Sequence, residues 1–267
     1  YYPQVSEKKT IILHHTAGNY GAETCAQIWG MTEPDSKIPV RKKKKDNGEY
    51  SSVKTFPLCT HYVITRDGGY EQMFADDYWS NNTGAGSSTS KPSLSMELEC
   101  LGFLKKKSGT YLDKTATYYS PGLGVTRTDE KWGGVSRPVK LVDKGQHDYK
   151  SSSGRYYKYI SYRGYSYYQR YPQKQLERMG IVIAAWSDKF SIPLAPKDFF
   201  TSGGKLRPAA KQWYEDMFPK KNKKSKNARN NVKGIYTHNS YLGSGKYDVY
   251  PSIQLIETII NFSQNRK

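Results

Sequence analysis

Three things are scarce in this sequence: cysteine, acidic residues and long apolar runs. Cysteine occurs only three times, at Cys25, Cys59 and Cys100, and never in a Cys-x-x-Cys pair. At least one cysteine therefore has no partner within the chain, which argues against a disulfide framework, and we interpret all three as small core residues. No stretch approaches the ~20 apolar residues that a membrane-spanning helix needs, so the sequence predicts no transmembrane segment.

Acidic residues are outnumbered, because 24 Asp and Glu face 42 Lys and Arg and leave a formal net charge of +18. A field of this sign attracts polyanions such as nucleic acid, a bacterial wall or an anionic membrane surface. Since the sequence contains no nucleic-acid-binding motif, we expect no specific nucleic-acid partner. A hydrophobic share of 36% and a mean hydropathy of -0.82 predict a compact core that carries long polar loops.

Strand patterns occur along the whole chain. The apolar run Thr10–Leu13 predicts a buried central strand. Residues 61–66 and 70–74 flank an Asp-Gly turn signal and predict a hairpin. Residues 95–100 alternate between polar and apolar side chains, and residues 232–237 predict a last strand.

Helical patterns lie between and after these strands, at residues 22–31, 172–190 and 253–262. The strongest begins at Pro172 and has an apolar stripe at helical spacing, formed by Leu176, Met179, Ile183, Trp186 and Phe190. Strands mixed with helices predict an α/β fold, with a central mixed sheet flanked by helices.

Polar segments interrupt these elements at about residues 34–56, 103–171 and 198–231, and we interpret the chain, residues 1–267, as one domain with three insertions. The run Arg41–Lys45 and a second basic, Asn-rich stretch in the last insertion are interpreted as solvated loops. The segment Tyr156–Tyr171 alternates Tyr and Arg, which suits stacking on bases or sugars, but we favour an edge hairpin packed on the core.

Histidine is rare, and two of the five histidines end expected strands. These are His14 and His238, and the loop after His238 contains Lys246 and Asp248. Strand ends at one edge of a sheet often converge on a site. Two imidazoles and one carboxylate would form a catalytic zinc site with an open fourth position. A buried histidine at a strand end is more often hydrogen-bonded core, so both interpretations stay open on spacing alone.

Four segments, in order, resemble the N-acetylmuramoyl-L-alanine amidase type 2 family, which includes amidase-type phage lysozymes and animal peptidoglycan recognition proteins. Ile11–Gly18 is similar to the family's opening strand with its first zinc histidine. Thr60–Gly68 is similar to the family's hairpin, and Ser95–Glu99 to a third strand of the family. The closing zinc segment is similar to His238 with a carboxylate ten positions later (248 minus 238). The three insertions lie outside this resemblance.

The resemblance implies a role for each site residue. It implies that His14, His238 and Asp248 hold zinc, while His15 faces away because successive strand residues point oppositely. It also implies that Glu99 is the catalytic acid and base and that Lys246 stabilises the oxyanion. The implied activity is cleavage of the amide bond between N-acetylmuramic acid and L-alanine in peptidoglycan, and the basic loops are expected to bind anionic wall polymers.

The sequence departs from the family pattern at a few positions. Thr60 stands where some relatives have a catalytic tyrosine, Glu97 replaces a small residue, and Trp79-Ser80 stands where many relatives have Trp-His. A peptidoglycan-binding module without catalysis is one alternative, although such relatives typically lose a metal ligand. A glycosidase that uses Glu97 and Glu99 is less favoured, since one strand rarely supplies both carboxylates. We expect a phage lysin or virion-associated enzyme acting on the host wall, or a secreted bacterial enzyme.

Overall fold

The fold is taken from a computed structural model of the chain. The described residues are 1–16, 25, 40–44, 50–54, 59–100, 102, 105–107, 110–112, 118–119, 142–144, 149–150, 156–157, 162–164, 167–169, 171–199, 207–244 and 248–264. The helix expected at residues 22–31 lies outside the described residues except for Cys25, which is helical.

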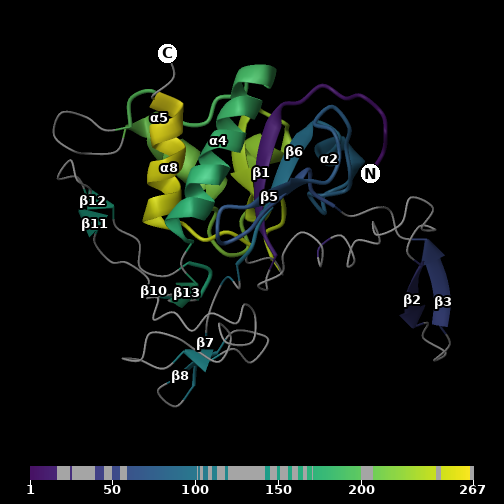
Figure 1. Ribbon diagram of the computed structural model, residues 1–267, viewed down its shortest axis with the longest axis horizontal. Coiled ribbons are helices and arrows are strands. Elements are labelled where there is room, and N and C mark those ends of the chain that lie inside the picture. Colours follow the sequence, from purple (N-terminus) through teal and green to yellow (C-terminus); the bar gives the residue numbers. More distant parts are fainter. Residues whose placement is uncertain are drawn as a thin grey trace.

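The centre of the fold is a five-stranded mixed sheet (Figure 1). Its strands are, in spatial order, β14 (Gly234–Thr237), β1 (Thr10–His15), β6 (Ser93–Leu98), β4 (Tyr62–Ile64) and β5 (Tyr70–Gln72). The first four strands run parallel, and β5 is antiparallel to β4. With helices against this sheet, the predicted α/β class is confirmed. The five expected strands are all present, with shifted ends.

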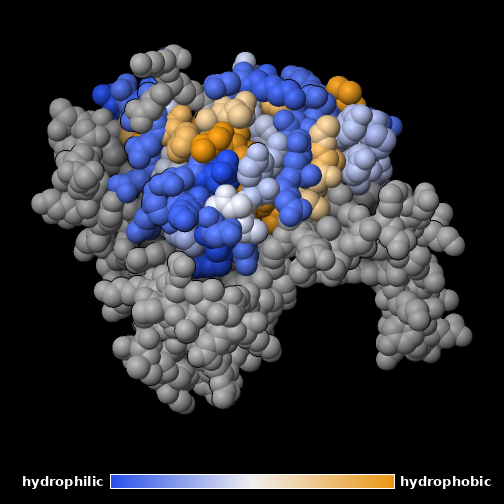
Figure 2. Space-filling model, viewed as in Figure 1, coloured by the Kyte–Doolittle hydropathy of each residue, from blue (hydrophilic) through white to orange (hydrophobic). Residues whose placement is uncertain are grey.

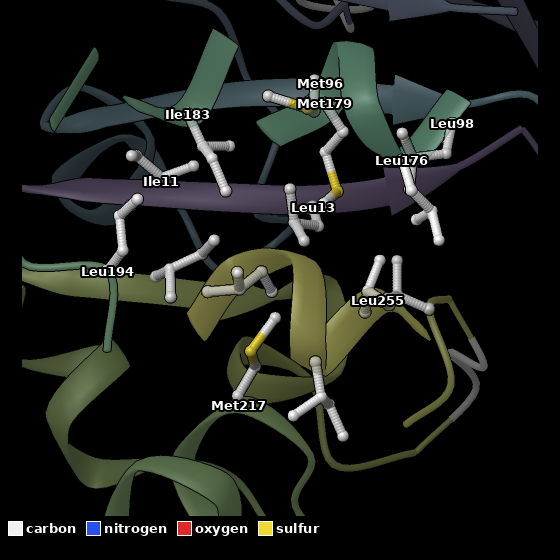
Figure 3. Packing of buried hydrophobic residues seen from close by; sticks show 14 of the residues in the cluster. Ile11, Leu13, Met96, Leu98, Leu176, Met179, Ile183, Leu194, Met217 and Leu255 are labelled. Carbon is white, nitrogen blue, oxygen red and sulfur yellow. The ribbon is translucent and has the colours of Figure 1, made fainter. Parts of the chain in front are cut away.

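One face of the sheet carries the main hydrophobic core, to which alternate strand residues such as Ile11, Leu13, Met96 and Leu98 contribute (Figure 3). The alternation expected for residues 95–100 is confirmed, because the apolar side chains of Met96, Leu98 and Cys100 all lie in this core. Three helices supply the other side of this core: α4 (Gln173–Phe190), α5 (Pro208–Met217) and α8 (Ile253–Gln264). Figure 1 shows α4 and α8 side by side in front of the sheet.

Helix α4 confirms the strongest helical pattern of the sequence. Pro172 is its N-cap, and Ser191 ends it in the left-handed conformation with φ 52°. Its stripe faces the core, with Phe190 partly buried and the rest buried. Gly180 lets α8 approach, because a Cβ added there would lie 2.2 Å from a ring carbon of Phe262. The helix expected at residues 253–262 is confirmed as α8.

The opposite face of the sheet carries a smaller apolar cluster and a polar layer. Ile12 and Tyr236 pack there against α6 (Lys226–Arg229) and α7 (His238–Tyr241). Beside them lie buried hydroxyls, amides and His61, close to the short helix α2 (Ser87–Ser90). This second face is where the site residues gather.

The hairpin between β4 and β5 turns at Asp67-Gly68, as the sequence predicts. The amide of Thr65 donates to the carbonyl of Gly69 and closes the turn. Gly68 has φ 89°, and a Cβ there would lie 2.9 Å from the carbonyl oxygen of Lys174 in α4. A side chain at this position would therefore strain the backbone and collide with the helix.

The insertions contain more regular structure than the sequence predicted. The interpretation of the second basic stretch, residues 219–231, as a loop is wrong where α6 lies. Helix α5, also within residues 198–231, contributes Ala210 and Met217 to the main core. Most of the basic run Arg41–Lys45 lies in a strand rather than a loop. The strands of the first two insertions pair antiparallel as β2 (Val40–Lys44) with β3 (Tyr50–Lys54), β7 (Lys105–Lys107) with β8 (Thr110–Leu112), β8 with β9 (Tyr118–Tyr119), β10 (Val142–Lys144) with β13 (Tyr167–Gln169), and β11 (Tyr149–Lys150) with β12 (Tyr156–Tyr157).

The segment Tyr156–Tyr171 does not form an edge hairpin of the central sheet, because its two strands pair with β10 and β11 instead. Two of its tyrosines, Tyr162 and Tyr171, are nevertheless buried in the main core.

The outer surface is mostly hydrophilic where it is described, with scattered apolar patches (Figure 2). Among the described residues, no helix is long and apolar enough to cross a membrane.

Candidate metal centre

Parallel strand ends bring His14 and His238 together. Strands β1 and β14 pair from Thr10 with Gly234 to Leu13 with Thr237, so the two histidines are the next residues along neighbouring strands. Thr237 ends the strand by capping α7 in a reciprocal capping box with Ser240. His238 is therefore fixed in the first position of α7, at the carboxyl edge of the sheet, where sites of α/β proteins commonly form.

Asp248 joins the two histidines as a third ligand candidate. The Nδ1 atoms of His14 and His238 lie 3.1 Å apart. Oδ2 of Asp248 lies 2.7 Å from Nδ1 of His238 and 3.7 Å from Nδ1 of His14. Two ligand atoms about 2.0–2.1 Å from a tetrahedral zinc ion are about 3.3 Å apart. The observed separations lie on both sides of that value, so the three side chains are close enough together to hold a metal ion.

The electrostatics of the site suit a cation. His14 and His238 are 3% and 7% exposed, so little water competes for their ring nitrogens. Burial opposes ionisation of Asp248, but the charge of His238 and hydrogen bonds from His14 and His238 hold the pKa of this carboxyl well below its ordinary value. A metal ligand must be ionised if it is a carboxylate, and Asp248 meets that condition.

Asn239 fixes the segment that carries Asp248. Its side chain is fully buried, and its Nδ2 donates to the backbone carbonyls of Asp248 and, at 3.3 Å, of Val249. Because Asn239 directly follows His238, the two ligand segments are connected by hydrogen bonds as well as by the intervening loop. No sequence pattern predicted this role for Asn239.

His15 projects from the opposite face of β1 to His14, yet it also approaches Asp248. Its Nε2 lies 3.7 Å from Oδ1 of Asp248, and its Nδ1 lies 3.1 Å from the carbonyl of Cys100. Asp248 lies beyond the end of β1, where one carboxyl group can contact side chains from both faces of the strand. Gly102 closes over the ring, because a Cβ there would lie 2.1 Å from Cε1 of His15.

The two glutamates of β6 differ in their surroundings. Glu97 pairs directly with His14 across the parallel strands and shares its face of the sheet. Glu99 lies one step beyond the strand, and its Oε2 accepts a hydrogen bond from the amide of Arg66 at 3.0 Å. Cys25 lies close to both carboxylates. Burial of the Cys25 thiol, reinforced by these two charges, raises its pKa to about 12.

The sequence named Glu97 with Glu99 as a less favoured glycosidase pair, but it did not place Glu97 beside His14. Its position beside His14 follows from the register of β1 and β6, which the sequence does not give.

The remaining predicted positions have structural partners or fall outside the described residues. Lys246 is outside the described residues. Thr60 is buried and its hydroxyl donates to the carbonyl of Tyr62 at 3.0 Å. Ser80 donates to the carbonyl of Cys59, and Trp79 stacks on Tyr2 with ring centroids 4.0 Å apart. Thr60 and Ser80 thus each donate a side-chain hydrogen bond to a backbone carbonyl.

No family model, no curated protein and no solved structure matches this chain. Its function has to be inferred from its own residues and their arrangement.

Proposed function

We propose that this protein is a zinc-dependent amidase that cleaves the bond between N-acetylmuramic acid and L-alanine in peptidoglycan. One observation carries the proposal: Nδ1 of His14, Nδ1 of His238 and a carboxylate oxygen of Asp248 converge at the carboxyl edge of parallel strands. The motifs that resemble the type 2 amidase family place the same three residues as ligands. The geometry brings together the same three residues that the sequence motifs suggest as ligands.

The donor set favours zinc over other divalent ions. Two imidazoles and one carboxylate are typical of catalytic zinc, whereas magnesium and calcium prefer oxygen ligands throughout. Three protein ligands leave a fourth position for water. A zinc ion held there would lower the pKa of its bound water to about 7 and would polarise a substrate carbonyl.

The protein's own groups would complete the reaction. Glu99 takes the proton of the attacking water and returns it to the leaving amine, and Lys246 stabilises the oxyanion of the tetrahedral state. Both roles come from the resemblance. Glu97 is the neighbour to test against Glu99, because its position opposite His14 brings a second carboxylate to the same face.

Basic surface residues support a polyanionic wall as the place of action. Between residues 219 and 233 the exposed cations are Lys220, Lys221, Lys223, Lys224, Lys226, Arg229 and Lys233. Such a surface adds long-range attraction to anionic wall polymers without touching the reacting bond.

Product analysis tests the proposal. Protein purified without chelator should contain about one zinc per chain, and it should release free peptide amino groups from peptidoglycan without new sugar reducing ends. Asp248→Asn should lose zinc and activity together. The matched control Asp198→Asn, which changes an exposed carboxylate, should keep both.

Other outcomes would point elsewhere. Reducing ends without free amines would indicate a glycosidase, and zinc binding and wall binding without either product would indicate a binding module. Failure to retain zinc would refute the proposal.

A further inference from the structure

A short segment of the second insertion is buried against the metal centre. Tyr162 and Arg163 are 7% and 5% exposed, although the insertion around them lies outside the family resemblance. Arg163 and Gly164 both have positive φ, 53° and 90°, so the chain makes a tight left-handed turn at this point. Burying a guanidinium costs free energy unless its donors are hydrogen-bonded. The hydrogen-bond partners of Arg163 therefore indicate the role of this turn.

The partners of Arg163 are backbone carbonyls around α7. Its Nε donates to the carbonyl of Pro219 at 3.3 Å. One terminal nitrogen donates to the carbonyls of Asn239 at 3.3 Å and Leu242 at 3.5 Å. The last carbonyls of a helix lack intrahelical donors, and a cation at that end satisfies them and the helix dipole. Arg163 thus closes the end of the one-turn helix that begins at the ligand His238.

The same contact leads to the second ligand. Asn239 accepts from Arg163 through its backbone and donates through its side chain to the backbone of Asp248. The path from Arg163 to Asp248 is therefore two hydrogen bonds long, and it passes through the residue next to His238. Arg163 does not touch any candidate ligand side chain in these contacts, so its action is on the segments that carry them.

We infer that Arg163 is a positioning residue of the metal centre, contributed by the insertion, which holds His238 and Asp248 at ligand distance. This inference depends on the metal centre of the proposed function. It predicts a specific loss, because residues that orient metal ligands typically change metal affinity or activity by about 10–100-fold when mutated. It also gives the insertion around residue 163 a role inside the fold.

Arg178 offers a matched control. Its Nε donates to a backbone carbonyl, that of Gly68, at 3.1 Å, and its guanidinium lies 4.7 Å from the ring of Tyr70. Arg163 makes the same two kinds of contact, with its guanidinium 5.8 Å from the ring of Tyr162. The two arginines differ in location, since Arg178 connects α4 to the turn of the β4–β5 hairpin.

The experiment measures zinc affinity by competition with a chromophoric chelator, alongside thermal unfolding of the zinc-free protein. Wild type is measured first, and absence of zinc binding there would refute the metal centre rather than the role of Arg163. Arg163→Met is expected to bind zinc about 10–100-fold more weakly, and Arg163→Lys, which keeps the charge but loses the fork, should fall between. Arg178→Met should bind zinc like wild type even if its unfolding temperature drops.

Two results would overturn the inference. One is an Arg163→Met protein with wild-type zinc affinity, whatever its stability. The other is an equal loss in the Arg178 variant, which would show a general effect of instability. If Arg163→Met does not fold, Arg163→Lys and Asn239→Ser decide by the same measurement. Both are then expected to weaken zinc binding, and wild-type affinity in both would overturn the inference.

Discussion

His61 provides the sharpest test of the fold around the site. It is fully buried, its Nε2 faces the carbonyl of Tyr78 at 3.1 Å, and its Nδ1 accepts the amide of Ser95 at 3.1 Å. These partners fix one neutral tautomer, with the proton on Nε2. A second proton on Nδ1 would point at a donor, so the folded protein resists protonation of this ring.

The size of the effect follows from the pKa. Burial, reinforced by the charge of Lys8, lowers the pKa of His61 from 6.5 to about 3. Each pKa unit corresponds to about 1.4 kcal/mol, so the preference of the folded protein for neutral His61 contributes up to about 5 kcal/mol to the free energy of unfolding. Because the folded pKa is below the unfolded one, this stability is complete above pH 6.5 and is lost as the pH falls from 6.5 towards 3. Between pH 7 and pH 4.5 the loss is about 2.5 kcal/mol.

The assay compares wild type with His61→Gln by urea unfolding at pH 7, 5.5 and 4.5, with chelator present throughout. Glutamine offers a donor and an acceptor but does not titrate in this range, and the other histidines contribute equally to both proteins. The variant is expected to be less stable at pH 7, with a difference that shrinks by about 2.5 kcal/mol by pH 4.5. A difference that stays constant with pH would show that His61 is not held neutral, and the placement of β4 against β6 would then be wrong.

Three further predictions follow from the site, the core and the surface. Glu99→Ala should keep zinc but slow turnover by about 10²–10⁴, whereas Glu97→Ala should be near neutral. A dead Glu97 variant beside an active Glu99 variant, by amine release, would reverse the assignment. Gly180→Ala should cost on the order of 1–3 kcal/mol in urea unfolding because the added methyl meets the ring of Phe262, and Phe262→Leu should recover part of that loss; an unaffected Gly180 variant would contradict the packing of α4 on α8. Neutralising Arg41–Lys45 should weaken co-sedimentation of the protein with cell walls, most at low salt, and barely change turnover of a soluble muropeptide. The same is expected when glutamine replaces Lys220, Lys221, Lys223 and Lys224. Equal losses on both substrates would argue against a purely electrostatic role.

Much of the central fold could be predicted because periodicity records burial. The run at Thr10–Leu13 and the stripe of α4 are apolar where they meet the core, and the structure has both. Helix α5 was missed although Ala210, Trp213, Tyr214 and Met217 follow helical spacing and pack on the core, because the polar stretch around it, residues 198–231, was interpreted as an insertion. The strands of the first two insertions are two to five residues long, too short for periodicity to single them out.

The ligand set could be proposed from sequence, but its supports could not. His14 and His238 follow apolar strands, and this pattern is visible in the residues. The contact of Arg163 with Asn239 arises only when an insertion 76 residues away in sequence folds back against α7. Sequence spacing carries no information about such a contact. The approach of His15 to Asp248 was missed for a related reason: strand alternation describes the strand itself, whereas Asp248 lies past its end.

His14 and His61 show why burial alone does not identify a metal ligand. Both project from the same face of the sheet, and they are 3% and 0% exposed, so a burial criterion treats them alike. Their partners differ. Both ring nitrogens of His61 face the protein backbone, which satisfies a neutral imidazole completely. Nδ1 of His14 faces Nδ1 of His238 and a carboxylate oxygen of Asp248. One proton shared among these three atoms satisfies them less well than a single cation bound by all three. On this reasoning His61 is a core residue, and His14 fits the ligand role proposed for it. Zinc should therefore raise the free energy of unfolding of wild type and of His61→Gln by similar amounts, whereas it should raise that of His14→Gln only a little.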